Sequence, residues 1–512
     1  MTRFPGVTPT RISRRGFLRT GAMATGAAAF LPWLPLPRDY LRGPLPSRRP
    51  GERSQRVIVL GAGLAGLAAA HELVRAGHEV TVIEAQNRSG GRVHTIREPF
   101  ADELYAEAGA MFAGGPHVGR YAEEFGIDFV SPGTGSGGSG AFQYVVRGER
   151  FLMRRGGEAP EPQWPLALSA VEREMGLDGM WETYVMGVVP EIGNPFDTAW
   201  PPDELRKYDD MSFAEYLADR GASPAAISLM RLDVLDMYGQ GFESVSALAF
   251  LRDWAGRRYM EPGGAGGVIP GGTDRFPEAM ASKLDGRTRY GSEAIRLEQD
   301  ADGVRIVCRR GGGEEVLTGD RLVCTVPFPV LRRLEISPAL PADKQKAIED
   351  LPYSTITRVY LQVERRFWED RGLNGAGWSD GGVPRVLVHP MGRRTTGAVL
   401  EAHTGKATGA RLAGLPEEDR IAFAARELET FHPGLAEHVE GGTSWAWLED
   451  PWARGGYASF APGQIFAFLP VIARPEGRIH FAGEHTSRLS TSMDGALESG
   501  VRAAEEIDAA GY

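Results

Sequence analysis

The feature that most constrains this chain is a glycine-rich turn between an apolar run and a helical run. The apolar run, residues 56–60, leads directly into Gly61, Ala62, Gly63, Leu64, Ala65 and Gly66. Gly61 allows a tight turn, and Gly63 lets backbone N–H groups approach a diphosphate at the helix N-terminus. Gly66 lets the helix press against the preceding strand. The order strand, turn, helix predicts a βαβ unit that holds the ADP half of a dinucleotide.

An acidic residue at the end of the next strand supports this prediction. Glu84, followed by Ala85, lies near the spacing of roughly 20 residues at which a carboxylate meets the ribose hydroxyls. An acid at this place favours FAD or NAD over NADP. Gly91 and Arg92 follow shortly afterwards, and a guanidinium supplies further donors for a diphosphate.

The segment from Gly90 to Val93 resembles the GG-R-V motif of flavoproteins of the amine oxidase and glutathione reductase-like superfamily. Near the C-terminus, residues 478–486 and 493–500 resemble the FAD signature of flavin amine oxidases, the family of monoamine, polyamine and L-amino acid oxidases. Residues 351–361 and 447–457 resemble two further segments of that family. The resemblance therefore runs from about residue 56 to the C-terminus.

The resemblance implies a fold and a cofactor. We expect an α/β protein with a Rossmann-like, glutathione reductase-like FAD-binding domain, a mixed-sheet substrate domain and a helical insertion. FAD is expected to bind without a covalent link. The residues implied in holding it are Gly61, Gly63, Leu64, Ala65, Gly66, Glu84, Ala85, Gly91, Arg92, Gly109, Ala110, Met111, Ala294, Gly483, Glu484, Met493 and Asp494.

The same resemblance identifies five residues of the reaction site, three of which depart from the family pattern. Trp447 and Tyr457 match residues that line the flavin and substrate pocket. Arg358 stands where monoamine oxidases carry a lysine that reaches the flavin through water, and arginine does not deprotonate under ordinary conditions. Ser492 replaces the second wall of the aromatic cage, and Phe112 occupies the place of a carboxylate-binding arginine of many L-amino acid oxidases.

The expected domains follow from the order of these segments. Residues 54–115, 265–350 and 475–512 are assigned to the FAD-binding domain, 116–150 and 351–474 to the substrate-binding domain, and 151–264 to the helical insertion. Ala294 and the run 304–308 are expected in strands that return to the nucleotide sheet. Residues 1–50 are assigned to an export signal and linker.

The export signal is predicted from Arg14 and Arg15, which precede a short alanine-rich apolar run. Paired arginines followed by Phe17 and Leu18 resemble a twin-arginine signal, so the twin-arginine translocase is an expected partner and the location is periplasmic or extracellular. A disordered basic tail is the alternative. The cysteines, Cys308 and Cys324, are expected as buried thiols, with a bridge between them left open.

Charge and histidine spacing narrow the remaining function classes. The net charge of −10 argues against nucleic acid as a partner, and the histidines show no metal-ligand spacing. We expect FAD-dependent oxidative deamination of a primary amine or L-amino acid, with dioxygen as acceptor and hydrogen peroxide as product. A desaturase-like or protoporphyrinogen oxidase-like flavoenzyme and a catalytically weak flavin-binding protein are the alternatives, and formation of a homodimer stays open.

Overall fold

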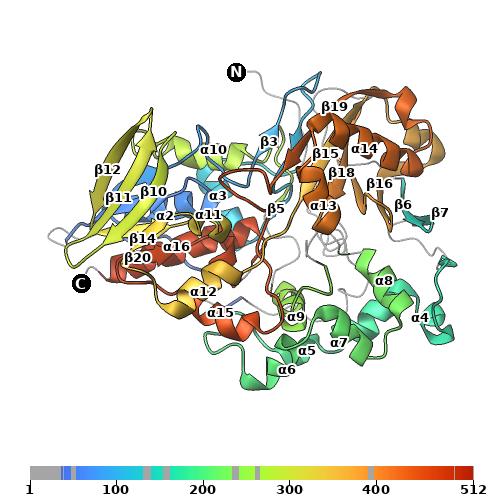
Figure 1. Ribbon diagram of the computed structural model, residues 1–512, viewed down its shortest axis with the longest axis horizontal. Coiled ribbons are helices and arrows are strands. Elements are labelled where there is room, and N and C mark those ends of the chain that lie inside the picture. The colour runs from blue at the N-terminus through green and yellow to red at the C-terminus, as the bar shows by residue number, and fades with distance from the viewer. Residues whose placement is uncertain are drawn as a thin grey trace.

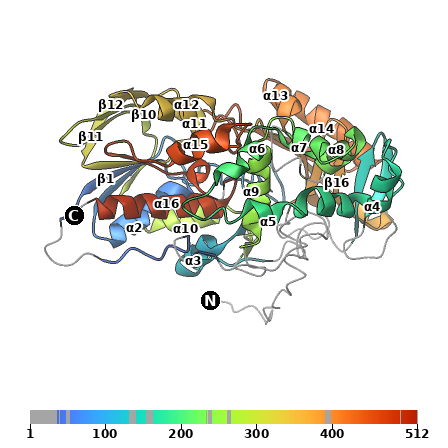
Figure 2. The ribbon, with the colours of Figure 1, turned by 90° about the horizontal axis from the view of Figure 1, so that it is seen from below.

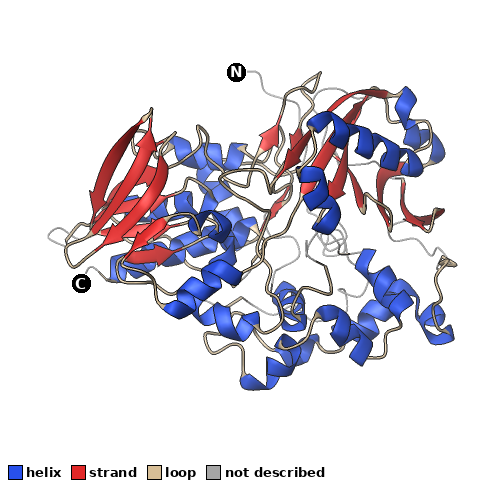
Figure 3. Cartoon of the chain, viewed as in Figure 1, coloured by secondary structure: helices blue, strands red, loops and turns tan. Residues whose placement is uncertain are grey.

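The computed structural model describes residues 36–37, 40–47, 53–130, 140–153, 162–232, 234, 241–259, 266–389, 397–488 and 490–510. The twin-arginine pair Arg14 and Arg15 lies outside these residues. Figure 1 shows a strand-rich region on the left, a second one at the upper right, and a group of helices below. Figure 3 shows that this lower group is almost entirely helical. Among the described residues, none of the helices is long and apolar enough to cross a membrane.

The first region is built on a five-stranded parallel sheet. Its order is β20 (Ile479–Phe481), β13 (Arg321–Cys324), β1 (Arg56–Leu60), β2 (Glu79–Ile83) and β9 (Thr288–Arg289). The central strand β1 is apolar and buried because helices cover the sheet. This is the expected Rossmann-like arrangement, and it confirms the α/β class.

Two helices pack closely against each other beside this sheet, α2 (Leu64–Arg75) and α16 (Met493–Ala509). Figure 2 shows them side by side. Small residues permit the approach: a Cβ added at Gly500 would lie 2.1 Å from the carbonyl oxygen of Ala65. At Gly66 an added Cβ would lie 1.9 Å from the carbonyl oxygen of Gly61. Gly66 therefore serves helix packing and closure of the turn.

A separate four-stranded sheet stands next to the five-stranded sheet, which we call the nucleotide sheet. Its order is β12 (Gly313–Gly319), β11 (Val304–Arg310), β10 (Glu293–Gln299) and β14 (Glu335–Ser337). Ala294 and residues 304–308 were expected in the nucleotide sheet, and this expectation is wrong. These segments pair with each other as antiparallel neighbours, because a short turn connects β11 to β12 and β10 reaches β11 directly. Cys308 and Cys324 lie in different sheets, buried and unbonded.

The second strand-rich region is a seven-stranded mixed sheet. Its order is β19 (Val439–Ala446), β15 (Thr357–Val363), β18 (Ala398–Thr404), β17 (Arg385–Val388), β16 (Leu373–Ser379), β6 (Ala141–Val146) and β7 (Glu149–Met153). Apolar side chains such as Leu361, Val386 and Leu400 form a core with Leu428 of α14 (Glu417–Phe431). The alternate side chains of the same strands lie on the opposite face. That opposite face carries the polar residues of the site.

The lower group comprises α4 (Ala170–Trp181), α5 (Val189–Ile192), α6 (Arg206–Asp209), α7 (Phe213–Asp219), α8 (Pro224–Leu232) and α9 (Ala247–Arg257). Capping boxes start α4 at Ser169 and α7 at Ser212. Stacked aromatic rings hold the group together, with Phe213 and Phe250 centred 3.7 Å apart. The helices of this group thus pack on one another.

One segment lies outside the domain to which the sequence assigned it. Helix α3 (Pro116–Phe125) packs on α16 and α10 (Arg275–Ser282), beside the nucleotide sheet, although residues 116–150 were assigned to the substrate domain. The reason is a buried apolar face that includes Val118 and Tyr121.

A short N-terminal strap, residues 40–47, also packs against the folded body. Tyr40 is 1% exposed, and its hydroxyl donates to Asp494 at 2.9 Å. Its ring contacts Phe196, which belongs to the helical group. The N–H of Leu45 donates to Glu72 of α2 at 2.8 Å. The strap therefore joins the nucleotide region to the helical group.

Candidate functional site

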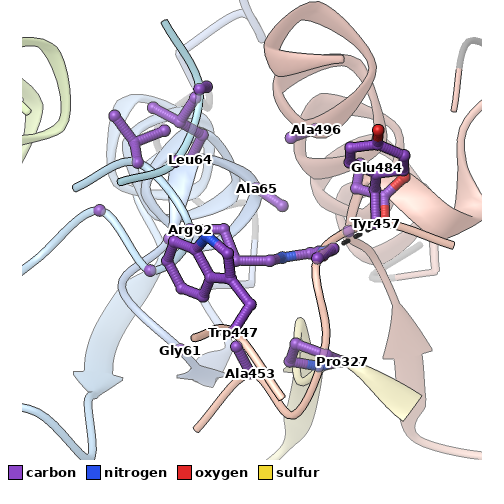
Figure 4. A pocket seen from close by; sticks show the side chains of 18 of the residues that line it. Gly61, Leu64, Ala65, Arg92, Pro327, Trp447, Ala453, Tyr457, Glu484 and Ala496 are labelled. Atoms are coloured by element: carbon purple, nitrogen blue, oxygen red, sulfur yellow. Dashed lines mark hydrogen bonds and ion pairs between the residues drawn. The ribbon is translucent and has the colours of Figure 1, made fainter. Parts of the chain in front are cut away.

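A cavity of about 480 Å³ runs between the nucleotide sheet, the seven-stranded sheet and helix α9. One end is lined by the glycine turn after β1 and by Glu84 at the end of β2. The other end is lined by aromatic residues and by side chains of the seven-stranded sheet. Figure 4 shows Arg92 extending between Trp447 on one side and Glu484 on the other. The cavity therefore joins a nucleotide-type turn to an aromatic, cationic chamber.

The glycine turn leaves backbone N–H groups available to a ligand. Gly61 has φ of +107°, a conformation that glycine adopts without strain. Gly63 is the N-cap of α2 and has no side chain to cap the helix, so the first N–H groups of α2 have no partner within the helix. Together with the positive end of the helix dipole, these donors form a site for a diphosphate.

Glu84 organises the turn that it faces. One carboxylate oxygen accepts the N–H of Ala62 at 2.8 Å, and the other accepts the N–H of Gln86 at 2.8 Å. Burial raises the pKa of Glu84, and the two N–H bonds oppose that rise. The carboxylate retains lone pairs for ribose hydroxyls, because each oxygen can accept more than one hydrogen bond.

Arg92 and Glu484 tie together segments that are far apart in the sequence. Arg92 Nη1 donates to Glu484 Oε1 at 3.0 Å and to the carbonyl oxygen of Gly456. Glu484 also accepts the N–H of Thr491 at 2.8 Å, immediately before the start of α16. The ion pair therefore sets the positions of the loops that enclose the middle of the cavity.

The first turn of α16 forms part of the cavity wall through Ser492, Met493 and Ala496. Ser492 is the N-cap and accepts the N–H of Gly495 at 2.9 Å. The N–H groups of the first two helical residues remain without a partner in the helix, and the dipole favours negative charge there. This end of the cavity therefore suits an electron-rich edge of a cofactor.

Asp494 lies away from the cavity, although it is next to Met493 in the sequence. It is fully buried, and its Oδ1 accepts the N–H groups of His117 and Val118 at 2.8 and 3.0 Å. These N–H groups belong to the first turn of α3, so Asp494 stabilises that helix N-terminus. The structure gives it a role in holding α3 on α16.

Arg358 holds the backbone of the segment that follows β4 (Ala106–Glu107). Its Nη1 donates to the carbonyl oxygens of Glu107 and Gly109 at 2.9 and 2.8 Å. Its Nε lies 3.4 Å from Oε1 of Glu401, which is fully buried. Gly109, Ala110, Met111 and Phe112 line the cavity directly after this anchor. Arg358 thus fixes a wall of the cavity as well as placing charge beside it.

The aromatic wall is formed by Trp447, Trp452 and Tyr457. The indole N–H of Trp447 donates to the carbonyl oxygen of Ala108 at 2.7 Å, which fixes the ring. The Tyr457 hydroxyl is buried and has no hydrogen-bond partner among the described residues. Burial also raises the pKa of Tyr457, so the hydroxyl keeps its proton. It is a donor placed for a ligand.

The chamber also contains a row of polar residues that no local sequence motif indicates. Arg358, His403 and Arg385 are direct partners across β15, β18 and β17, so their side chains lie on one face of the sheet. All three line the cavity. Behind them, Glu401 accepts from His403 Nδ1 at 2.8 Å and from His389 Nε2 at 2.5 Å.

The charges of this row set the protonation of its members. The Arg358 guanidinium and the two histidine hydrogen bonds hold the pKa of Glu401 well below its usual range, against the effect of burial. Burial, together with the charges of Arg358 and Arg385, lowers the pKa of His403 to about 4. Near neutral pH the row therefore carries a neutral imidazole with one guanidinium group on each side of it.

The structure brings nearly all of the predicted site residues to one cavity. Every residue named for the reaction site lines it, as do the residues named for the cofactor except Gly66 and Asp494. Arg257, Arg385, His403 and Trp452 line it as well. The first three belong to helix α9 or to strands whose pairing no local motif reveals.

The residues present fit FAD bound without a cysteinyl link. Cys308 and Cys324 are the two cysteines of the chain, and neither lines the cavity. At Gly456, where some members of the resembling family carry a cysteine, an added Cβ would lie 2.5 Å from Ser354 Oγ. The open helix N-termini and the Glu84 carboxylate match a diphosphate and a ribose.

Comparison with known proteins gives a consistent result. Residues 64–508 match the family model of flavin containing amine oxidoreductases. The flavin-dependent L-tryptophan oxidase RebO of Lentzea aerocolonigenes is 30% identical over 486 residues, which cover 89% of this chain and 98% of that protein. The L-amino-acid oxidase of Demansia vestigiata is 26% identical over 471 residues, covering 89% and 87%.

Among solved structures, the fold is similar to that of wild-type putrescine oxidase bound to putrescine. The TM-score is 0.75 at 22% identity, and the match covers 89% of this chain and 99% of that chain. Cyclohexylamine oxidase from Brevibacterium oxydans IH-35A matches with a TM-score of 0.71 at 23% identity, covering 90% and 99%. At these identities the likeness concerns the fold.

Proposed function

The chain belongs to the flavin containing amine oxidoreductase family, and from this premise we propose that it oxidatively deaminates a primary amine or an L-amino acid. The observation that carries the proposal is the single cavity that joins the Glu84 turn to the chamber of Trp447 and Tyr457. A cofactor held by its diphosphate at the turn would place its reacting part in that chamber.

The chemistry supplied by a bound flavin is acceptance of a hydride equivalent from the carbon that bears the amine, with dioxygen as final acceptor and hydrogen peroxide as product. Water then hydrolyses the imine to a carbonyl compound and ammonia. The chain's own residues orient the substrate and exclude water. Trp447 and Tyr457 supply a dry wall, and a dry chamber favours the neutral amine that the reaction needs.

The supporting residues keep this chamber in shape. Arg358 anchors the segment that carries Gly109 to Phe112, and the ion pair of Arg92 with Glu484 positions the loops around Gly456. The first turn of α16 offers backbone N–H groups and the positive end of a dipole. None of these groups has to gain or lose a proton for the substrate to be held.

The proposal is tested by mixing the purified protein with a panel of amines and L-amino acids in the absence of oxygen. At least one compound should bleach the flavin absorbance, and readmission of air should restore it with release of hydrogen peroxide and ammonia. A yellow protein that none of the compounds bleaches would instead support the alternative of a flavin-binding protein with little catalysis.

We propose further that FAD is held without a covalent bond. Acid precipitation should release intact FAD into the supernatant, because neither cysteine lines the cavity. Flavin retained in the washed pellet would contradict this.

We also propose export through the twin-arginine pathway, on the strength of the paired arginines near the N-terminus. Replacing both Arg14 and Arg15 by lysine should leave a folded, yellow protein inside the cell. The unaltered protein, expressed in parallel in the same host, is the control. Normal export of the double variant would show that the signal has been misread.

A further inference from the structure

We infer that His403 forms a subsite for the far end of the substrate, where its ring nitrogen Nε2 accepts a hydrogen bond from an uncharged O–H or N–H group. The inference rests on the proposed amine oxidation and narrows the substrate to an amine or amino acid whose side chain carries such a donor. His403 lies on β18 and lines the cavity. The local motifs that indicated the cofactor turn and the aromatic wall do not include it.

The hydrogen bonds behind His403 determine which of its ring nitrogens carries a proton. Glu401 is fully buried and is held as a carboxylate, so its side chain can only accept. It accepts from His403 Nδ1 at 2.8 Å and from His389 Nε2 at 2.5 Å. His389 is itself oriented by the backbone N–H of Glu107, which donates to its Nδ1 at 3.2 Å. The proton of His403 therefore lies on Nδ1, and Nε2 of the neutral ring is an acceptor.

The neighbours of His403 on the sheet differ from it in hydrogen-bonding character. Arg358 and Arg385 are its direct partners on β15 and β17, and a guanidinium only donates. The row therefore presents one acceptor between two donors. Among the described residues none donates to His403 Nε2, so this atom is left for a ligand. A buried acceptor that stays unpaired costs free energy, which favours a ligand that supplies the missing donor.

The surroundings of His403 favour an uncharged donor over an ammonium group. Burial and the guanidinium groups of Arg358 and Arg385 lower the pKa of His403 to about 4, so a positive charge on this ring is unfavourable. The same surroundings act against an ammonium group in contact with Nε2, because like charges repel strongly where water is excluded. A hydroxyl or an amide N–H carries no charge and avoids this repulsion. The subsite thus discriminates against a second ammonium group in the substrate.

The position of His403 in the sheet places this contact away from the reacting amine. Trp447 of the aromatic wall directly follows β19, whereas His403 lies on β18, with β15 between the two strands. Neighbouring strands lie about 4.8 Å apart, so β18 is roughly 10 Å from the strand that leads to the aromatic wall. A substrate whose amine lies at that wall therefore reaches His403 with the far end of its side chain.

The first test compares tyramine with phenethylamine, and L-tyrosine with L-phenylalanine, because the members of each pair differ by one hydroxyl group. In the unaltered enzyme the hydroxylated member should have the higher kcat/KM, by about tenfold or more. His403→Leu removes the acceptor and should bring this ratio close to one, through a loss confined to the hydroxylated substrates. His403→Gln, whose amide can donate to Glu401 and accept from a ligand, should retain part of the preference. The matched control is His432→Leu, at a buried histidine that does not line the cavity, and it should leave the ratio unchanged.

A second measurement does not depend on turnover. The compounds p-cresol and 4-methylanisole share one ring, but only p-cresol carries an O–H donor. The unaltered holoenzyme should bind p-cresol more tightly, with a change in flavin absorbance and a higher unfolding temperature, and His403→Leu should abolish the difference. In holoenzyme labelled with ¹⁵N-histidine, the ring resonances that disappear in His403→Gln should be those of a neutral ring protonated at Nδ1.

The outcomes separate this inference from the proposed function. Equal losses of kcat/KM for both members of a substrate pair in His403→Leu, or p-cresol binding that does not depend on residue 403, would overturn the inference and leave amine oxidation intact. A protonated Nε2 in the labelled holoenzyme would overturn it as well, even if His403→Leu does not fold. If no amine bleaches the flavin while p-cresol binding depends on His403, the proposed function fails and the acceptor subsite stands.

Discussion

The buried ion pair between Arg358 and Glu401 allows a prediction whose size follows from the contacts. Glu401 is fully buried, and the guanidinium Nε of Arg358 lies 3.4 Å from its Oε1. Arg358→Met leaves a buried carboxylate without its cation, which costs about 3–5 kcal/mol. The carbonyl of Gly109 also loses its donor, at about 1 kcal/mol, whereas that of Glu107 keeps the Tyr360 hydroxyl. The free energy of unfolding should fall by about 4–6 kcal/mol.

A double-mutant cycle separates the charge effect from the loss of packing. Glu401→Gln alone should also destabilise, because it leaves the arginine buried without its carboxylate. In the Arg358→Met background, however, the same change should stabilise the protein by about 2–3 kcal/mol, since it removes the stranded charge. Arg358→Lys, which retains a cation, should lie between the unaltered protein and Arg358→Met.

Thermal unfolding of the four proteins, with FAD content measured for each, is the assay. The decisive observation is the sign of the Glu401→Gln effect in the two backgrounds. If the losses of the two single variants simply add in the double variant, Arg358 does not stabilise Glu401 electrostatically and our account of this row is wrong. Lower pH should partly restore the stability of Arg358→Met. The charge of Arg358 lowers the pKa of His403, so in its absence His403 should gain a proton more readily and supply a cation to Glu401.

Three further predictions concern other parts of the site. Glu84→Ala should weaken FAD binding about 10- to 150-fold, because a charge-assisted contact of about 1.5–3 kcal/mol is lost. The control, Glu79→Ala at the exposed start of β2, should leave FAD binding unchanged. Titration of the apoprotein with FAD measures both affinities. Burial raises the pKa of Glu107 to about 7, so its contribution to stability is present below the unfolded pKa and is lost as the pH rises toward 7. The difference in unfolding free energy between the unaltered protein and Glu107→Gln should therefore shrink by up to about 3 kcal/mol from pH 4.5 to 7.5, and a difference independent of pH would contradict the shift. Gly500→Ala should lower the free energy of unfolding by about 1–3 kcal/mol or more, because the new Cβ would lie 2.1 Å from a carbonyl oxygen of α2. The control, Gly441→Ala, has open space around the new Cβ and should change the unfolding temperature little.

The sequence predicted those parts of the cavity wall that a local backbone conformation forms. The turn of Gly61 and Gly63, the acid Glu84 and the loop at Gly483 are contiguous segments, and each lines the cavity. Their roles depend on a local conformation that glycine and chain direction determine. A local pattern is sufficient for such residues.

The sequence did not predict the cavity residues whose place depends on pairing between distant strands. Arg385 and His403 belong to no local motif, and only the register of β17 with β18 places them beside Arg358. Asp494 shows the opposite case, since its position in the sequence is right but its side chain turns to the start of α3. Ala294 was placed in the wrong sheet and yet lines the cavity. Strand register and side-chain direction were the missing information.

The strap around Tyr40 has a consequence for the maturation of the protein. Tyr40 is inserted between Asp494 of the last helix and Phe196 of the helical group, and Leu45 is bonded to the first helix of the nucleotide region. A peptidase that cut on the C-terminal side of Tyr40 would remove a side chain that bridges the first, middle and last thirds of the chain. A cut ahead of residue 36 would leave all of these contacts in place. Any removal of N-terminal residues that keeps these contacts therefore has a boundary, which the ring of Tyr40 sets.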